Sequence, residues 1–352
     1  MSNFLTRLMG GGGNYAYVTA RVRAKKNQLL EADAYPKLLA REASEIARTL
    51  QEGQYKAEID ELAARHRGAE LVERATRLNL GRTYGQILHF ASGELALTIA
   101  AYLARYDVYN VKTILRGKFA GARPEDILDE TIPAGSLTPR LPELSRLERI
   151  DDVVEALRGT PFHRVLVKNT EGRQLSNLIV VENDLDRTYY EMLLESVAQS
   201  GSANRVFLSW IRNEIDVVNL KTLFRLRFAR VTEWEPYFLP GGTDLSREAA
   251  ARIVRGSDEE LIAEVGQLDV APEVVDAART SVASGNLNAI ATALDRELVR
   301  DAQDFSHRAP LSVLPVVDFI LRKKIEADNL RAIAYGKQTG LPAETIQELL
   351  IT

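Results

Sequence analysis

The sequence contains no cysteine. Disulfide bonds, thiolate catalysis and cysteine-ligated zinc or iron–sulfur sites are therefore excluded, and an intracellular setting is favoured. Histidine is also scarce, because only His66, His89, His163 and His307 occur and they lie far apart in the sequence. A metal site needs clustered ligands, so we interpret these histidines as surface or core residues and predict no metal site.

Long apolar runs are missing as well. The best candidate, Leu95–Ala104, is enclosed by Glu94 and Arg105 and is far shorter than a membrane-spanning helix. The start of the chain has neither a long apolar stretch nor the small-residue cleavage site of a secretory signal. We therefore expect no transmembrane segment and no signal peptide, so any work at a membrane would be peripheral.

The sequence has no marked excess of charge and no nucleotide motif. Its net charge of −4 gives no broad attraction to nucleic acid, and its 45% apolar and 27% charged residues are typical of a soluble globular protein. The glycine run 10–13 lacks the Gly-Lys-Ser/Thr of a phosphate loop, and Gly241-Gly242 has no surrounding GxGxxG pattern. No serine has the context of a nucleophile elbow. We predict no catalytic residue, no cofactor and no small-molecule substrate.

What the sequence does contain is one stretch in three copies, which we call the cassettes: Tyr106–Gly121, Asp216–Ala229 and Glu326–Lys337. Aligned on Asn110, Asn219 and Asn329, the copies are 109 and 110 residues apart. The alignment also superimposes the acids Asp107, Asp216 and Glu326 and the cations Lys112, Lys221 and Arg331. Near-equal spacing of three copies indicates a triplicated structural unit.

A second, weaker repeat precedes each cassette. Arg82-Thr83-Tyr84 matches Arg187-Thr188-Tyr189, and Leu185-Asp186-Arg187 matches Leu294-Asp295-Arg296. Each unit should therefore end with the same pair of helices, antiparallel if their connection is short. The units are expected at 1–121, with a glycine-rich leader at 1–13, at 122–230 and at 231–352.

Apolar periodicity predicts helices almost throughout, and hence an all-α fold of three similar subdomains around a pseudo-threefold axis. Long helical stretches are expected at 55–80, 83–121, 173–199, 204–229 and 316–337, and shorter helices at 125–129, 144–157, 245–256, 258–266, 272–283, 287–302 and 341–350. Proline and glycine predict linkers at 122–142 and 236–244.

Each cassette carries its acid and its asparagine on one helical face, because Asp107, Asn110, Val111 and Ile114 are spaced i, i+3, i+4 and i+7. Two interpretations stay open. Each asparagine could make a buried hydrogen bond that fixes helix register, or the three could face a common axis and line a socket for a partner. An active site is disfavoured, because chemistry usually needs one asymmetric constellation. An enzyme would have only Asp107, Asp216 and Glu326 as organised carboxylates.

Four stretches resemble the C subunit of the archaeal-type (A/V-type) ATP synthases, which is similar to the d subunit of vacuolar ATPases. They are YAYVTARVRAKKNQLL near the start, YDVYNVKTILRGK in the first cassette, the linker YFLPGG and the C-terminal IEADNLRAIAYGKQTGLP. The resemblance implies a funnel-shaped, non-catalytic rotor adaptor on the cytoplasmic face of the membrane. It would link the membrane proteolipid ring to the central shaft, built from D- and F-type subunits, and transmit torque between ion transport and ATP synthesis or hydrolysis.

Basic residues on the cassettes are the candidates for binding such partners: Lys112, Arg116, Lys118, Lys221, Arg225, Arg227, Arg331 and Lys337. They could meet acidic partner residues or simply form a solvated face. The third cassette departs from the pattern, with Ala332 and Tyr335 where the first two have threonine and arginine. The alternative function is a cytoplasmic helical-repeat scaffold that binds an unrelated protein.

Overall fold

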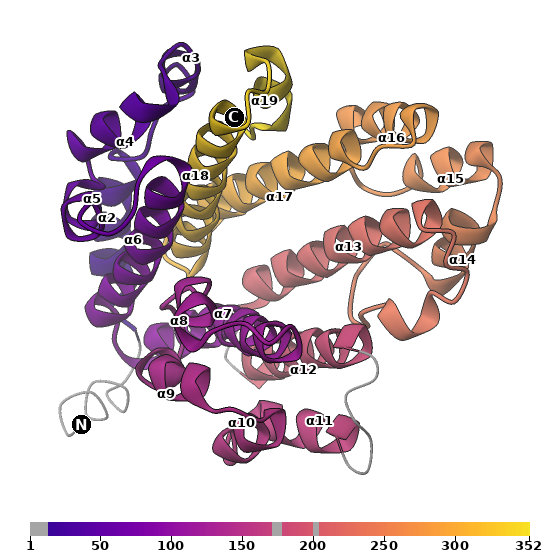
Figure 1. Cartoon of the computed structure of the whole chain (residues 1–352). Helices are drawn as coiled ribbons and strands as arrows, with labels where there is room; N and C mark the ends of the chain where they lie inside the picture. The colour runs from indigo at the N-terminus through magenta and orange to yellow at the C-terminus, as the bar shows by residue number, and fades with distance from the viewer. Residues whose placement is uncertain (1–12, 171–177, 200–203) are drawn as a thin grey trace. The chain divides into compact units, whose positions relative to one another are not determined.

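The computed structural model describes residues 13–170, 178–199 and 204–352 (Figure 1). All regular secondary structure in these three stretches is helical, which confirms the predicted all-α fold. The chain divides into two compact units, one formed by residues 1–189 and 319–350 and the other by residues 190–318 and 351–352. The division into three subdomains and their pseudo-threefold arrangement remain predictions.

The first unit begins with α2 (Tyr15–Lys26), followed by four short or medium helices and two long ones. These are α3 (Ala34–Leu39), α4 (Ala43–Gln51), α5 (Lys56–Leu62), α6 (Gly68–Phe90), α7 (Gly93–Phe119) and α8 (Pro124–Asp129). The unit continues with η1 (Thr138–Arg140), α9 (Leu141–Arg146), α10 (Ile150–Ala156), α11 (Pro161–Thr170) and α12 (Leu178–Gln199), which crosses into the second unit.

The second unit contains the second cassette in α13 (Arg205–Phe228). It also contains η3 (Glu235–Tyr237), α14 (Arg247–Arg255), α15 (Asp258–Val265), α16 (Pro272–Ser284) and α17 (Asn288–Arg308). Helix α18 (Leu314–Gln338) starts in this unit and passes back into the first, where α19 (Ala343–Leu349) closes the helical part of the chain. The helices predicted from 245 onward are confirmed to within a few residues, except that α17 runs to Arg308.

The predicted break between helices at residues 80–83 is wrong, because α6 runs straight through it and the chain turns at Ala91–Ser92. Gly81 stays inside α6, and a Cβ there would lie 2.5 Å from the carbonyl oxygen of Pro133. Because glycine has no side chain, the segment around Pro133 can pack against the helix at this point, and the helix continues through Gly81. The helix expected at 144–157 is likewise divided into α9 and α10.

The three cassette helices end in the same way, eleven residues after their asparagine. Gly121, Arg230 and Gly340 have φ values of 68°, 57° and 73°, in the left-handed region. In each copy the next residue donates its N–H to a carbonyl five residues earlier, at 2.8–2.9 Å. This pattern is the Schellman motif, so the repeat extends to the way each helix stops.

The repeat also reaches the short helices that follow two of the cassettes. A Cβ on Gly117 would come within 3 Å of the Ile127 side chain, and a Cβ on Gly336 would come equally close to Ile346. Both isoleucines lie ten residues after their glycine. The glycines therefore let α8 and α19 pack closely on α7 and α18. The second copy has Leu226 at this position, and only the single turn η3 follows it.

Each unit has its own apolar core. In the first, Tyr35, Ile46 and Tyr55 from the N-terminal helices pack with Leu330 of α18 and Ile346 of α19. In the second, α13 packs with α14–α17 in a separate cluster of buried residues. The N-terminal helices thus share a core with the end of the chain.

Candidate interaction sites

The repeated asparagines hold the segments that follow their helices. Asn110 donates its side-chain N–H to the carbonyl of Ile132 at 2.7 Å and accepts the N–H of Ile132 at 2.8 Å. Asn219 makes the same two bonds to Leu239, both at 2.8 Å. Both side chains are buried, so one amide satisfies both polar groups of a buried backbone residue that lies outside any helix.

The aspartates one turn earlier bind the same two segments slightly farther along. Asp107 accepts the N–H and hydroxyl of Ser136 and the N–H of Leu137, at 2.8–2.9 Å. Asp216 accepts the N–H groups of Thr243 and Asp244, at 2.7 and 2.8 Å. Burial raises the pKa of both aspartates, since these donors are neutral and only partly offset the loss of water.

A glycine faces each of these two carboxylates. Any Cβ on Gly135 would collide with Asp107, and any Cβ on Gly242 would collide with Asp216. The Gly241-Gly242 turn, which has no nucleotide motif around it, therefore allows the backbone to approach the acid. The Asn and Asp side chains together attach each following segment to its cassette helix at two successive points.

The third cassette takes its hydrogen-bond donors from the beginning of the chain. Glu326 accepts the N–H of Leu30 at 2.5 Å, the hydroxyl of Tyr55 at 2.5 Å and the side-chain amide of Gln54 at 2.9 Å. The ammonium group of Lys323, whose side chain is 1% exposed, lies 2.8 Å from the same carboxylate. Burial lowers the pKa of Lys323, and Glu326 opposes that shift.

Asn329 is buried too, and the Tyr35 hydroxyl shares a hydrogen bond with it. Burial raises the pKa of Tyr35 to about 12. All three cassette asparagines and all three acids are therefore enclosed in the first or the second unit. Their burial and their internal hydrogen bonds favour the interpretation in which each asparagine fixes its own helix over the interpretation of a socket lined by the three.

Two predicted cassette cations form matching ion pairs with the next helix pair. Lys112 pairs with Asp186 of α12, and Lys221 pairs with Asp295 of α17, both at 2.5 Å. In both pairs the partners are 74 residues apart. Burial raises the pKa of Asp186, and Lys112 opposes that shift. Each pair joins one cassette helix to the helix that precedes the next cassette.

Three other predicted cations also bind within the chain. Arg116 makes a two-pronged ion pair with Glu182, at 2.5 Å for each nitrogen–oxygen contact. Lys118 donates to the carbonyl of Ser145. Arg227 donates to the carbonyls of Ile253 and Gly256 and to Asp258, and so attaches α13 to the α14–α15 turn.

Tyr335, one of the two departures in the third cassette, makes a hydrogen bond within the chain. Tyr335 replaces the arginine found in the first two copies, and its hydroxyl donates to Glu73 of α6 at 2.5 Å. Arg77, one turn along α6, occupies the position that Glu182 has in α12, and it already pairs with Glu73 at 2.7 Å. An arginine at 335 would compete with Arg77 for Glu73, whereas the tyrosine hydroxyl shares that carboxylate with Arg77.

The remaining predicted cations are more open. Arg225 is exposed, Lys337 is half-buried, and no ion pair joins either of them to the rest of the described chain. Arg331 reaches Asp328 at 3.3 Å across one helical turn, with its side chain 45% exposed. Among the eight predicted cations, these three make the fewest contacts within the described chain, and the partner-binding role of all eight remains a prediction.

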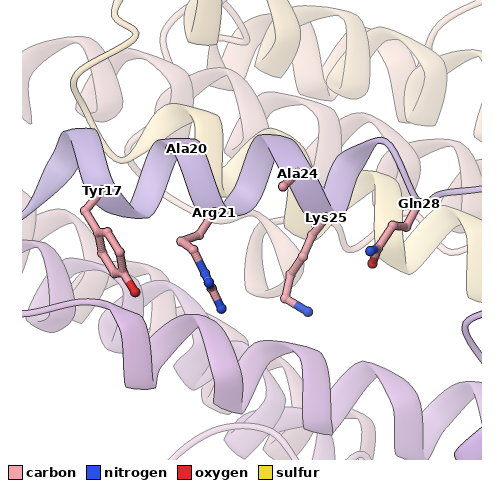
Figure 2. A pocket seen from close by; sticks show the side chains of 6 residues that line it. All are labelled: Tyr17, Ala20, Arg21, Ala24, Lys25 and Gln28. Atoms are coloured by element: carbon pink, nitrogen blue, oxygen red, sulfur yellow. The ribbon is translucent and has the colours of Figure 1, made fainter.

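Helix α2 presents a surface that the cassette motifs do not reveal. It buries Val18, Thr19 and Val22 and leaves the opposite face open. A hollow of about 420 Å³ runs along this open face and is lined by Tyr17, Ala20, Arg21, Ala24, Lys25 and Gln28 (Figure 2). We call these six residues the α2 face. Their helical spacing, with cations on one stripe, was the signal that could have identified it.

Two kinds of site are missing from the described part of the chain. It contains no group of three His, Asp or Glu residues arranged to hold a metal ion. None of its helices combines the length and the apolar character needed to cross a membrane.

Comparison with known proteins agrees with the resemblance seen in the four sequence stretches. The profile of the ATP synthase (C/AC39) subunit family matches residues 18–349. The A-type ATP synthase C subunit of Methanococcoides burtonii is 38% identical over 346 residues, which cover 97% of this chain and 95% of that protein. The C subunits of Haloferax volcanii and Archaeoglobus fulgidus are 35% and 32% identical, over 97% of this chain and 98% and 97% of theirs. The chain therefore belongs to the ATP synthase (C/AC39) subunit family.

Proposed function

We propose that this chain is the non-catalytic rotor adaptor of an A-type ATP synthase, placed between the membrane proteolipid ring and the central shaft formed by D- and F-type subunits. It would bind peripherally at the cytoplasmic face and transmit torque between ion transport and ATP synthesis or hydrolysis. The observation that carries the proposal is family membership along nearly the whole chain, together with relatives named as the C subunit of that complex.

The contacts within each unit suit a part that must resist twisting. Every cassette helix is attached to a neighbouring segment through its buried acid, and in two copies by the paired bonds of its asparagine. Ion pairs then join successive repeats at Lys112–Asp186 and Lys221–Asp295. Side chains fixed at several points lose little further freedom under load, so such a body transmits force with little internal deformation.

The proposal is tested by reconstituting the complex with and without this chain. Without it, the head should still hydrolyse ATP, but hydrolysis should no longer drive ion transport in proteoliposomes. Adding the purified chain should restore coupling, and the chain alone should show no ATPase activity. If coupling is the same with and without the chain, or if the chain binds neither shaft nor ring, the adaptor role is wrong and the scaffold alternative gains support.

A further inference from the structure

The hollow on the α2 face is elongated along a single helix. Its lining residues, from Tyr17 to Gln28, are spaced i, i+3, i+4, i+7, i+8 and i+11. At 1.5 Å per residue the hollow extends roughly 16 Å, or three helical turns. Ala20 and Ala24 are both exposed and contribute only methyl groups, so another backbone can come close there. A furrow of this form accepts a rod-like element better than a loop tip.

The charge of the furrow is uncompensated. Arg21 and Lys25 lie one turn apart and project from the same side of α2, between Tyr17 and Gln28 (Figure 2). None of the described residues that line the hollow is a carboxylate. Arg21 lies over the ring of Phe90, with 4.3 Å to the ring centroid, and forms no ion pair within the described chain. Lys25 likewise has no acidic partner there.

The two cations also affect each other. Lys25 is half-buried, and burial together with the neighbouring Arg21 charge lowers the pKa of its ammonium group. Two like charges held together in a partly enclosed hollow are a local cost to the chain. A partner with carboxylates at the same spacing would remove that cost on binding.

We propose that the α2 face binds an acidic α-helix of the central shaft, with two carboxylates one turn apart placed against Arg21 and Lys25. This inference rests on the proposed adaptor function and identifies the surface through which the shaft is held. Tyr17, which is 52% exposed, would cover an apolar side chain at one end of the contact.

The test compares charge reversals on and off the α2 face. Arg21→Glu/Lys25→Glu reverses the two furrow cations, and Arg23→Glu/Arg65→Glu makes the same change in net charge at two exposed arginines outside the furrow. Binding of each protein to the purified shaft subunits and to the detergent-solubilised proteolipid ring is measured by surface plasmon resonance. The furrow reversal should weaken shaft binding by about 100-fold, and the control by less than about threefold.

The neutral double variant Arg21→Gln/Lys25→Gln is a control for misfolding of the charge reversal, because it introduces no new charge beside Phe90. It should weaken shaft binding by about tenfold and leave ring binding and the melting temperature unchanged. Replacing the shaft's facing carboxylates with lysine should restore binding to the furrow reversal. Wild-type affinity in the furrow variants, or loss of ring binding only, overturns this inference while the adaptor role stands. Failure of the wild-type chain to bind the shaft overturns the adaptor role itself.

Discussion

At the scale of single residues, the side-chain amide of the repeated asparagine makes the hydrogen bonds that another stretch of backbone would otherwise make. Helix interiors disfavour asparagine because its amide competes with the helix for backbone partners. In Asn110 and Asn219 that tendency is used on a neighbouring segment, whose N–H and carbonyl have no helical partner. The sequence showed that these residues share a position, but which backbone groups they meet depends on tertiary contacts that no local pattern contains.

Replacing Asn110 with alanine should therefore cost about 2 kcal/mol of unfolding free energy. It leaves the buried N–H of Ile132 without a partner and removes one of the two donors to the Ile132 carbonyl, which keeps the N–H of Ala134. Chemical denaturation measures the change. Asn27→Ala, at an exposed asparagine after α2, is the matched control and should stay within about 0.5 kcal/mol of wild type. Equal effects of the two substitutions would contradict the paired-bond role.

Asp301 of α17 gives the fold a pH dependence. Burial, opposed by Arg300 and reinforced by Asp304, raises the pKa of Asp301 to about 6 from its usual value of 3.8. Between these values the native state binds more protons than the unfolded state, so stability falls as pH rises through this window. The Asp301→Asn variant should lose that slope and be more stable at pH 7, by about 1 kcal/mol because partial exposure screens the charge.

Thermal unfolding of both proteins in a series from pH 4 to pH 7 checks this prediction. The melting temperatures should converge towards pH 4, where the wild-type carboxyl is protonated and neutral like the amide. Parallel curves over the whole range would show that another group is responsible.

At the scale of helices, the cassette elements are defined by how they end as much as by their apolar face. Periodicity predicted α13 and α18 well, since both carry long stripes of buried residues. It placed the break before α7 wrongly at residues 80–83, where Gly81 lies inside α6 at a point of close approach to Pro133. The 74-residue spacing of Lys112–Asp186 and Lys221–Asp295 was present in both repeats and could have predicted the pairs.

Arg230 is the exception among these helix ends. Among the described residues it is the only non-glycine with positive φ, while the first and third copies have glycine there. The left-handed conformation costs a side chain with a Cβ about 1 kcal/mol. Arg230→Gly should therefore raise the unfolding free energy by about 1 kcal/mol, measured by denaturant titration.

The reverse substitution is the control. In Gly121→Ala the new Cβ meets open space, so only the strain of the left-handed backbone should affect stability. The unfolding free energy should therefore fall by about 1 kcal/mol. If Arg230→Gly proves destabilising, the arginine side chain must make a contact that outweighs its strain.

At the scale of the whole chain, its beginning is joined to its end in one compact unit. Tyr55 and Leu30 bind Glu326, and the N-terminal helices share a core with α18 and α19. Sequence comparison found the third cassette but not its partners, since the donors lie almost 300 residues away. The substitution of glutamate for aspartate at 326 was a sign that this copy binds something different.

Removing the Glu326 carboxylate should be more costly than removing an ordinary surface acid. Glu326→Ala leaves the Lys323 ammonium buried without its counter-charge, which should lower the unfolding free energy by about 3–5 kcal/mol. The double variant Lys323→Met/Glu326→Leu removes both charges and should recover most of that loss. A double variant as unstable as Glu326→Ala would show that the bonds to Leu30 and Tyr55, and not the charge pair, carry the effect.

The hydrogen bond between the Leu30 N–H and the Glu326 carboxylate also affects the order in which parts of the chain fold during synthesis. The two residues are 296 positions apart, so the N-terminal helices leave the ribosome long before their partner exists. Until α18 and α19 emerge, the core around Tyr35, Ile46 and Tyr55 lacks its C-terminal members, and the apolar surface that these would cover stays open to chaperones and to other nascent chains. The second unit can fold in that interval, so the first part of the chain to be made is among the last to be completed.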